Sequence, residues 1–261
     1  MVEITSRENP TYKMVKSLAR KKGRTQTGMY FAEGVRLVEE ALQDAAEQLV
    51  CILVSASYTG HGRPVDTLLG KTQKPVYVLR DALFRTLCGT ETPQGIAAVL
   101  RIPQPPAEIP AHADYLLIID GVAEPGNLGT ILRTAEAAGV DLVCLRAGSA
   151  DLYNPKVVRS TMGSVFRVPV MPFAAPELLD TLHQAGFLVI ATALQPHAIP
   201  PQAVTAGKKR ALIIGSEASG VSEDLLARAD ACVRLPMAGR VESLNAAVAA
   251  GILLYQFKTE D

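Results

Sequence analysis

The sequence predicts a protein of the α/β class, with a largely parallel sheet preceded by a smaller α/β unit. The chain of 261 residues is long enough to bury one large core or two modest ones. Helix-length stretches separate the apolar runs of the second part, and this alternation is typical of parallel sheets that carry helices. The strand-like runs lie at 115–119, 141–145, 187–192, 211–214 and 231–235.

The first hundred residues show a shorter alternation of helices and strands. In the stretch 35–46, Val35, Val38 and Leu42 recur at helical spacing and share one face. The same pattern predicts helices at 11–22 and 81–87. Short strands are expected near 30–31 and at 51–54, 76–79 and 95–101.

A proline-rich segment separates the two parts of the chain. Its four prolines, Pro103, Pro105, Pro106 and Pro110, cannot continue a helix or a central strand and suit an extended linker. We therefore predict three regions: an N-terminal domain at 1–101, a linker at 102–113 and a second domain at 114–261.

Charge and cysteine content exclude several classes of protein. The 26 basic residues balance the 26 acidic ones, which excludes a highly basic polymer-binding protein. Residues 1–24 nevertheless carry seven basic residues against two acidic ones, so a local basic patch is expected there. No apolar run approaches the length of a bilayer span, and the N-terminus lacks a signal-peptide core, so we expect a cytoplasmic protein without a membrane partner. The scattered Cys and His residues form neither a disulfide framework nor a metal site.

Three polar, glycine-containing segments follow predicted strands, which is the usual position of ligand sites in α/β sheets. Residues 120–133 carry Asn127 and Arg133, and the turn Gly-Ser-Glu-Ala-Ser-Gly at 215–220 carries Glu217. Residues 235–245 lead into an apolar helix expected at 243–257, where Ser243 can cap the helix. An amide such as Asn245 inside that helix needs partners for its donors and acceptors.

Each segment alone is compatible with an ordinary turn or helix N-terminus. The chain lacks a phosphate-binding P-loop, a G-x-S-x-G nucleophile elbow and the G-x-G-x-x-G fingerprint, and the last absence disfavours a dehydrogenase.

Taken together, the three segments resemble the motifs of the SpoU (TrmH) family of RNA ribose 2′-O-methyltransferases. The resemblance rests on N-x-G-x-x-x-R at 127–133, G-S-E-A-S-G at 215–220 and L-P-M followed by S-L-N within 235–245, and it spans 115–261. The first part looks like the family's N-terminal RNA-binding, substrate-recognition domain, with G-x-x-x-x-E-G at 28–34. This resemblance implies a SPOUT-class α/β domain with a deep trefoil knot, which runs against the usual rule for chain topology.

The resemblance also implies a site and its partners. Arg133 would lie at the catalytic centre, surrounded by Asn127, Glu217, Ser243 and Asn245. The cofactor S-adenosylmethionine would be bound by Thr192, Gly215, Leu235, Met237 and Leu244. The family is homodimeric through its C-terminal helix, which agrees with the apolar character of 243–257, and it uses no metal.

The implied reaction is attack of a ribose 2′-oxygen on the methyl carbon of a sulfonium. Arginine is a poor base because its pKa is about 12 or higher, so we expect Arg133 to grip the phosphate beside the target ribose. Glu217 can either accept the hydroxyl proton or orient Arg133, and the sequence leaves both roles open.

The segment 154–164 resembles the ribosomal RNA branch of the family, so the favoured substrate is ribosomal RNA of the large subunit. Alternatives are a tRNA ribose methyltransferase and a non-catalytic RNA-binding protein on the same fold, although the intact motif residues disfavour the second. Phosphate contacts without sequence choice are expected from basic side chains. The expected RNA-binding residues are Arg7, Lys16, Arg20, Lys21, Lys22, Arg24 and Arg159.

Overall fold

A computed structural model describes residues 2–60, 64–174, 176–193, 195, 198–241 and 243–258. The chain divides into two compact units. The first comprises Met1–Gln104 together with Asp151–Arg167, and the second comprises Pro105–Ala150 together with Val168–Asp261. Both units are mixtures of helices and strands, so the predicted α/β class is confirmed.

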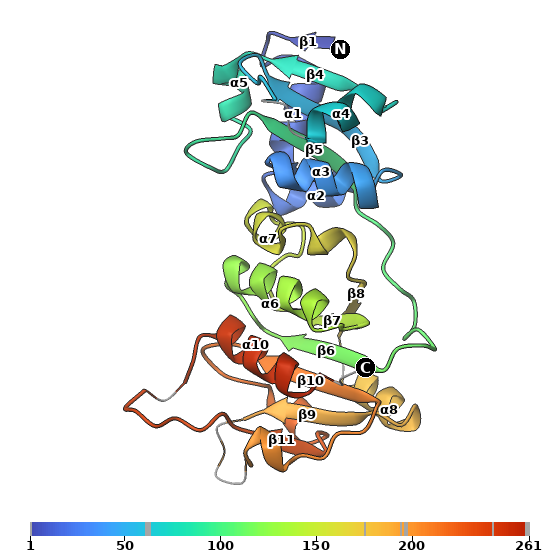
Figure 1. Ribbon diagram of the computed structural model, residues 1–261, viewed down its shortest axis with the longest axis vertical. Helices are drawn as coiled ribbons and strands as arrows, with labels where there is room; N and C mark the ends of the chain where they lie inside the picture. The colour runs from blue at the N-terminus through green and yellow to red at the C-terminus, as the bar shows by residue number, and fades with distance from the viewer. Residues whose placement is uncertain are drawn as a thin grey trace. The chain divides into compact units, whose positions relative to one another are not determined.

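The first unit is built on a five-stranded mixed sheet in the order β1-β4-β3-β5-β2. Helices α1 and α5 supply Tyr12, Val15 and Phe84 to a core on one face of this sheet, and α3 packs on the strands from the other face (Figure 1). The strands are β1 (Val2–Ile4), β2 (Met29–Glu33), β3 (Leu49–Ser55), β4 (Val76–Leu79) and β5 (Ile96–Arg101). The helices are α1 (Pro10–Ser17), α2 (Lys21–Thr27), α3 (Val35–Asp44), α4 (Pro64–Lys71), α5 (Asp81–Arg85), α7 (Pro155–Thr161) and the 3-10 helix η1 (Ser164–Phe166).

The single helix predicted at 11–22 is wrong, because the chain turns between α1 and α2. At Gly23 a Cβ atom would lie 2.1 Å from the carbonyl oxygen of Ser17, so this close approach of two backbone segments requires glycine. Gly23 therefore lies inside α2, whereas the predicted helix ended just before it. β1 and α4 were not predicted from the sequence.

The segment Asp151–Arg167 packs with the first unit although the sequence predicts a second domain that begins at residue 114. This segment connects two strands of the second unit and contributes α7 to the first. Its contacts with the N-terminal part include the ion pairs Arg24–Asp151 (2.7 Å), Arg159–Glu33 (3.4 Å) and Arg167–Asp44 (2.6 Å). The rings of Tyr30 and Tyr153 also pack together, with their centroids 4.7 Å apart.

The position of Arg24 corrects its expected role as an RNA contact. Arg24 is only 3% exposed, donates a hydrogen bond of 2.7 Å to the carbonyl oxygen of Leu18 and pairs with Asp151. Reaching a phosphate would leave Asp151 without this cation, and breaking such a pair is costly. Arg24 therefore stabilises the first unit, and its buried side chain is not available to a phosphate.

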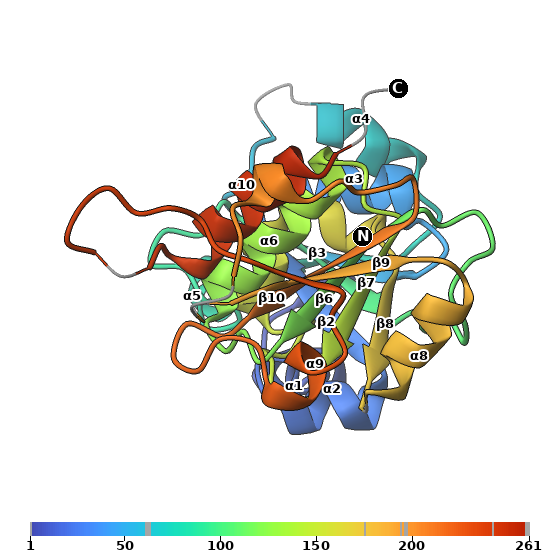
Figure 2. The ribbon, with the colours of Figure 1, turned by 90° about the horizontal axis from the view of Figure 1, so that it is seen from below.

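The second unit contains a six-stranded sheet, all of whose strands are parallel, in the order β11-β9-β10-β6-β7-β8. Helices α8 and α9 pack on one face of this sheet, and α6 and α10 pack on the other (Figure 2). The strands are β6 (Tyr115–Asp120), β7 (Leu142–Arg146), β8 (Val170–Phe173), β9 (Leu188–Thr192), β10 (Arg210–Gly215) and β11 (Ala231–Val233). The helices are α6 (Pro125–Ala137), α8 (Glu177–Gln184), α9 (Glu223–Leu226), α10 (Ala246–Gln256) and the 3-10 helix η2 (Pro201–Ala203).

β8 is the strand of this sheet that the sequence did not predict. It contains Pro172, which disfavours a strand assignment, but β8 lies at the edge of the sheet, where proline is tolerated. None of the described helices has the length and apolar character to cross a bilayer.

The strand order places two of the predicted ligand segments side by side. β6 and β10 are direct neighbours, with Asp120 opposite Gly215 at their carboxyl ends. The connections from β6 and β10 lead away in opposite directions along the sheet. Ligands bind at such a reversal in open α/β sheets.

Candidate functional site

A cavity of about 500 Å³ opens at the carboxyl ends of β9, β10 and β11. This volume lies in the usual range for small-molecule sites. Apolar side chains such as Ile214 and Leu253 share the wall with the polar Gln195 and Ser216. The residues expected to bind the cofactor all line this cavity, together with Ser243: Thr192, Gly215, Leu235, Met237 and Leu244.

A chain of hydrogen bonds joins the three sequence segments at the rim of this cavity. The side-chain amide of Asn127 donates to a carboxylate oxygen of Glu217, which itself lines the cavity. Asn245 Nδ2 in turn donates to Asn127 Oδ1 over 3.0 Å. Residues separated by about 90 and 118 positions in the chain therefore form one polar unit.

This arrangement fixes the orientation of both amides. Asn127 uses its donor toward Glu217 and its acceptor toward Asn245, while its backbone N–H donates to Glu124 over 2.7 Å. Since Asn127 contacts one oxygen of the Glu217 carboxylate, the other oxygen can accept a further donor. The site therefore presents an oriented proton acceptor beside a small-molecule cavity.

The final helix begins later than predicted, and its cap is a different residue. Asn245 is the N-cap of α10, and its Oδ1 accepts from the backbone N–H groups of Ala247 (3.0 Å) and Val248 (3.3 Å). The prediction that Ser243 caps the helix and that Asn245 lies within it was wrong. Ser243 instead lies in the preceding loop, where it lines the cavity.

Arg133 lies apart from the hydrogen-bonded chain. Arg133 is exposed on α6. It follows Asn127 by six positions, and at 3.6 residues per turn this spacing places the two side chains on different faces of the helix. Within the described part of the chain, no side chain forms a hydrogen bond or ion pair with Arg133. Its guanidinium therefore faces solvent, available to a ligand that arrives from outside.

Most of the expected RNA-binding residues are exposed in the first unit: Arg7, Lys16, Arg20, Lys21 and Lys22. Arg159 is half-buried and pairs with the buried carboxylate of Glu33, which also accepts from the backbone N–H of Gly89 over 3.0 Å. Arg159 thus has a structural partner.

Sequence reasoning missed a second polar cluster at the same edge of the sheet. Arg146, the last residue of β7, forms two hydrogen bonds to the carboxylate of Asp224, of 3.0 and 2.5 Å. Hydrogen bonds from Arg146 and Ser222 lower the pKa of Asp224 to about 2. The sequence did contain one signal for this cluster, because Asp120 is a carboxylate at the end of an otherwise apolar strand. In the structure, Asp120 contacts Arg146.

Comparison with known proteins matches both parts of the chain. The SpoU rRNA Methylase family matches residues 114–255, more than half of the chain. The chain belongs to this family. The MRM3-like substrate binding domain matches residues 9–98, so the predicted N-terminal substrate-binding domain is confirmed.

Relatives of this SpoU family member extend over its full length. The chain is 41% identical over 258 residues to the 23S rRNA (guanosine(2553)-2′-O)-methyltransferase RlmP of Bacillus subtilis, covering 99% of this chain and 100% of that protein. It is 29% identical to the 23S rRNA (uridine(2479)-2′-O)-methyltransferase of Streptomyces viridochromogenes, covering 97% and 90%. The AdoMet-bound rRNA methyltransferase from Sinorhizobium meliloti superposes with a TM-score of 0.85 at 30% identity, covering 97% and 96%. The predicted SPOUT-class fold is confirmed, and the trefoil knot stays a prediction.

Two substitutions at Asn245 separate its roles as helix cap and as amide donor. Asn245→Ala removes the side-chain oxygen that caps α10 and should lower the free energy of unfolding by about 1 kcal/mol. Asn245→Asp keeps that oxygen and adds a charge favourable at a helix N-terminus, so it should retain most of the stability. Urea unfolding measures both. An equal loss in the two variants would show that the donor to Asn127, and not the cap, stabilises this region.

Proposed function

We propose that this protein transfers the methyl group of S-adenosylmethionine to a ribose 2′-oxygen in large-subunit ribosomal RNA. The observation that carries the proposal is the chain Glu217–Asn127–Asn245 at the rim of the cavity, because it joins all three predicted motifs. Relatives that cover the whole chain and carry 23S rRNA 2′-O-methyltransferase names support the same reaction. We propose a cytoplasmic location for this activity, because the proposed substrate is ribosomal RNA.

The cavity suits S-adenosylmethionine in size and in chemistry. Leu235, Met237 and Leu244 offer apolar contacts for a flat base, while Thr192 and Ser243 offer hydroxyl groups for polar parts. When bound, S-adenosylmethionine supplies an electrophilic methyl carbon attached to a sulfonium. The chain's own residues must then orient the ribose hydroxyl toward that carbon and remove its proton.

We assign proton acceptance to Glu217. One of its carboxylate oxygens is held by Asn127, which leaves the second oxygen to face an incoming hydroxyl. No contact among the described residues joins Glu217 to Arg133, so the alternative role for Glu217, orienting Arg133, has less support. Asn127 and Asn245 act by holding the carboxylate in place.

Arg133 is assigned to the RNA. A solvent-facing guanidinium can form a forked pair of hydrogen bonds with the phosphate beside the target ribose, which fixes the position of the hydroxyl. This role needs no contact with the cofactor.

Arg133→Ala should therefore reduce methyl transfer by about 100-fold or more, because a misplaced nucleophile reacts slowly, while the Kd for S-adenosylmethionine stays within about twofold of wild type. The assay measures labelled methyl transfer to unmodified 23S, 16S and transfer RNA transcripts, followed by nucleoside analysis. Arg228→Ala serves as the control, since Arg228 is an exposed arginine of the same unit that pairs with Asp180. Loss of cofactor binding in Arg133→Ala would overturn its assignment. Transfer by wild type to transfer RNA alone, or to none of the three, would contradict the proposed function.

The exposed basic side chains on α1, α2 and the flanking loops are proposed to contact RNA phosphates. The combined change of Arg20, Lys21 and Lys22 to Ala should weaken RNA binding and reduce the slope of log K against log salt by about 0.7–0.9 per lost contact. Filter binding at several salt concentrations measures this slope. Lys208→Ala, an exposed lysine of the second unit, is the control. An unchanged slope in the triple variant would show that this face is only solvated.

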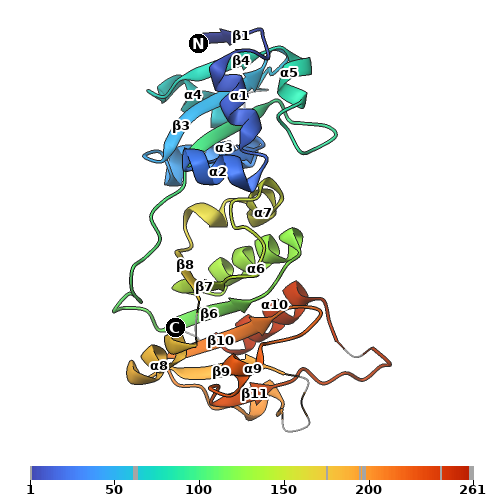
Figure 3. The same ribbon diagram turned by 180° about the vertical axis from the view of Figure 1, so that it is seen from behind.

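We also propose a homodimer through α10. Val248, Ile252 and Tyr255 lie at helical spacing on one face of α10 and are 52%, 46% and 55% exposed. Such a continuous exposed stripe of large apolar side chains is unusual in a monomer. α6 covers another face of the same helix (Figure 3). The exposed stripe fits a second copy of this chain, as the family resemblance implies.

Ile252→Asp should convert a dimer into a monomer at micromolar concentration, because it places a charge in a desolvated interface. Sedimentation velocity reports the oligomeric state. Val2→Asp is the matched control, since Val2 is 58% exposed in the first unit and lies outside the proposed interface. A monomeric wild type, or a dimer that survives Ile252→Asp, would contradict the proposed interface.

A further inference from the structure

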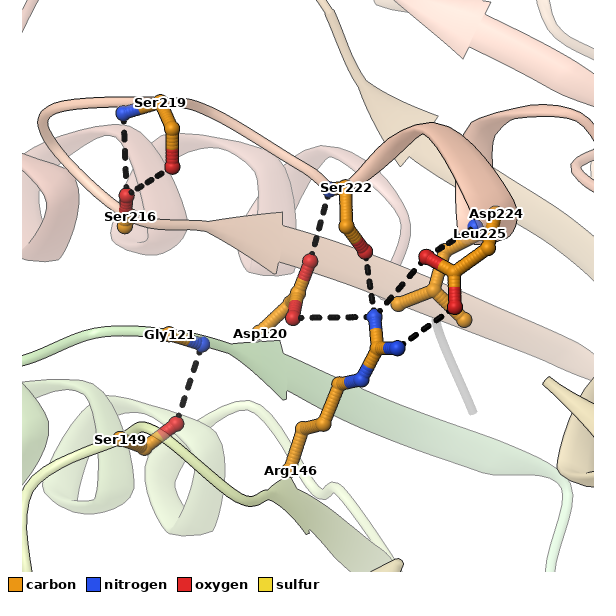
Figure 4. Close-up of polar contacts among 9 residues, drawn as sticks. All are labelled: Asp120, Gly121, Arg146, Ser149, Ser216, Ser219, Ser222, Asp224 and Leu225. Atoms are coloured by element: carbon orange, nitrogen blue, oxygen red, sulfur yellow. Dashed lines mark hydrogen bonds and ion pairs between the residues drawn. The ribbon is translucent and has the colours of Figure 1, made fainter. Parts of the chain in front are cut away.

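Four residues form a polar clamp beneath the loop that follows β10: Asp120, Arg146, Ser222 and Asp224. Figure 4 shows these side chains converging on the guanidinium of Arg146. Asp120 Oδ2 accepts from the backbone N–H of Ser222 over 2.7 Å, and Asp120 Oδ1 lies 3.4 Å from Arg146 Nη1. The same Nη1 donates to the hydroxyl of Ser222, and both terminal nitrogens of Arg146 bind Asp224.

Burial makes this clamp more than a surface ion pair. Asp120 is 7% exposed, and its carboxylate is the group that connects β6 to the end of the loop. A buried carboxylate needs hydrogen-bond donors or a cation, and Arg146 together with the backbone of Ser222 supplies both. Since Asp120 ends β6 and Arg146 ends β7, two strands of the sheet anchor the clamp.

The loop itself is a small hairpin that is held together internally. Ser216 and Gly220 exchange two backbone hydrogen bonds of 3.0 Å, and Ser216 Oγ accepts from the backbone N–H of Ser219 over 3.1 Å. At Gly215 a Cβ atom would lie 2.1 Å from the carbonyl carbon of Gly220, so the hairpin closes too tightly for any side chain there. Residues 215–221 therefore form one rigid unit, whose first residue is held in place at the end of β10.

The clamp fixes the exit of this hairpin, at Ser222. The hairpin carries Glu217 at its tip, and residues 215–221 all line the cavity. A shift of the exit would therefore move both the carboxylate held by Asn127 and one wall of the cavity.

We propose that Asp120 and Arg146 are positioning residues for methyl transfer, which hold the 215–221 hairpin in the geometry that binds the methyl donor and places Glu217. This inference rests on the proposed function for its catalytic consequence. Neither residue touches the cavity, so each acts through the hairpin.

Arg146→Met is the principal test, because methionine preserves much of the side-chain length and removes the charge and the donors. Hydrogen exchange in the 216–222 segment of the free protein should become about tenfold faster or more, as expected when hydrogen bonds to charged groups are lost. The Kd for S-adenosylmethionine should rise by about tenfold, while the KM for RNA stays within about twofold. Arg146→Lys keeps a charge beside Asp120 but cannot bridge Ser222 and Asp224 as a fork, so it should give intermediate values.

Two further variants serve as a control and as an alternative test. Arg228→Met removes an exposed arginine paired with Asp180 in the same unit and should behave as wild type in every measurement. Asp120→Asn keeps the shape and an acceptor for Ser222 but removes the charge, so it tests the clamp from the other side if Arg146→Met fails to fold.

Wild-type exchange and wild-type cofactor affinity in Arg146→Met would overturn the inference. A lower melting temperature with unchanged affinity in the folded fraction would also overturn it, because the clamp would then be only structural. If wild type binds no S-adenosylmethionine, the proposed function fails, while the exchange measurement still decides whether the clamp holds the hairpin.

Discussion

The parallel pairing of β6 with β10 is the constraint on which the rest of the second unit depends. It places Asp120 opposite Gly215, so the chain segments that leave these two strands start from the same edge of the sheet. The first segment turns into α6 and carries Asn127, and the second forms the hairpin that carries Glu217. Both strands are buried along their whole length, and a slip of one residue would change which apolar side chains pack against each other in a close-packed core. The hydrophobic core of the sheet thus sets the register that aligns the polar site.

Hydrogen-bond satisfaction then converts proximity into a defined geometry. Asn245 caps α10 with its oxygen and donates to Asn127 with its nitrogen, so one side chain both begins a helix and orients its neighbour. Asn127 in turn donates a hydrogen bond that orients the carboxylate of Glu217. Asp120 and Arg146 bind Ser222 at the end of the hairpin that carries Glu217. A site assembled in this way is organised before any RNA arrives, which is the condition under which positioning accelerates a reaction with a poor nucleophile.

Sequence reasoning reached those parts of the molecule that depend on local pattern. The strands of the second unit and the segments that line the cavity follow from apolar runs and glycine-containing turns, and the resemblance to a family added their roles. The sequence did not predict features that depend on contacts between distant residues. These features are the ion pair of buried Arg24 with Asp151, the packing of α7 in the first unit and the clamp around Arg146. The cap of α10 was misplaced by two residues, since Ser243 and Asn245 both have the chemistry of a cap and only the path of the loop decides between them.

A crystal structure of the protein with bound S-adenosylmethionine tests the central claim most directly, namely that three distant segments form one methyl-transfer site. The predicted result is S-adenosylmethionine in the cavity, in contact with Leu235 and Leu244. Its transferable methyl group should face Asn127 and Glu217. A cofactor bound outside this cavity, or one whose methyl group points away from Glu217, would contradict the assignment of these residues.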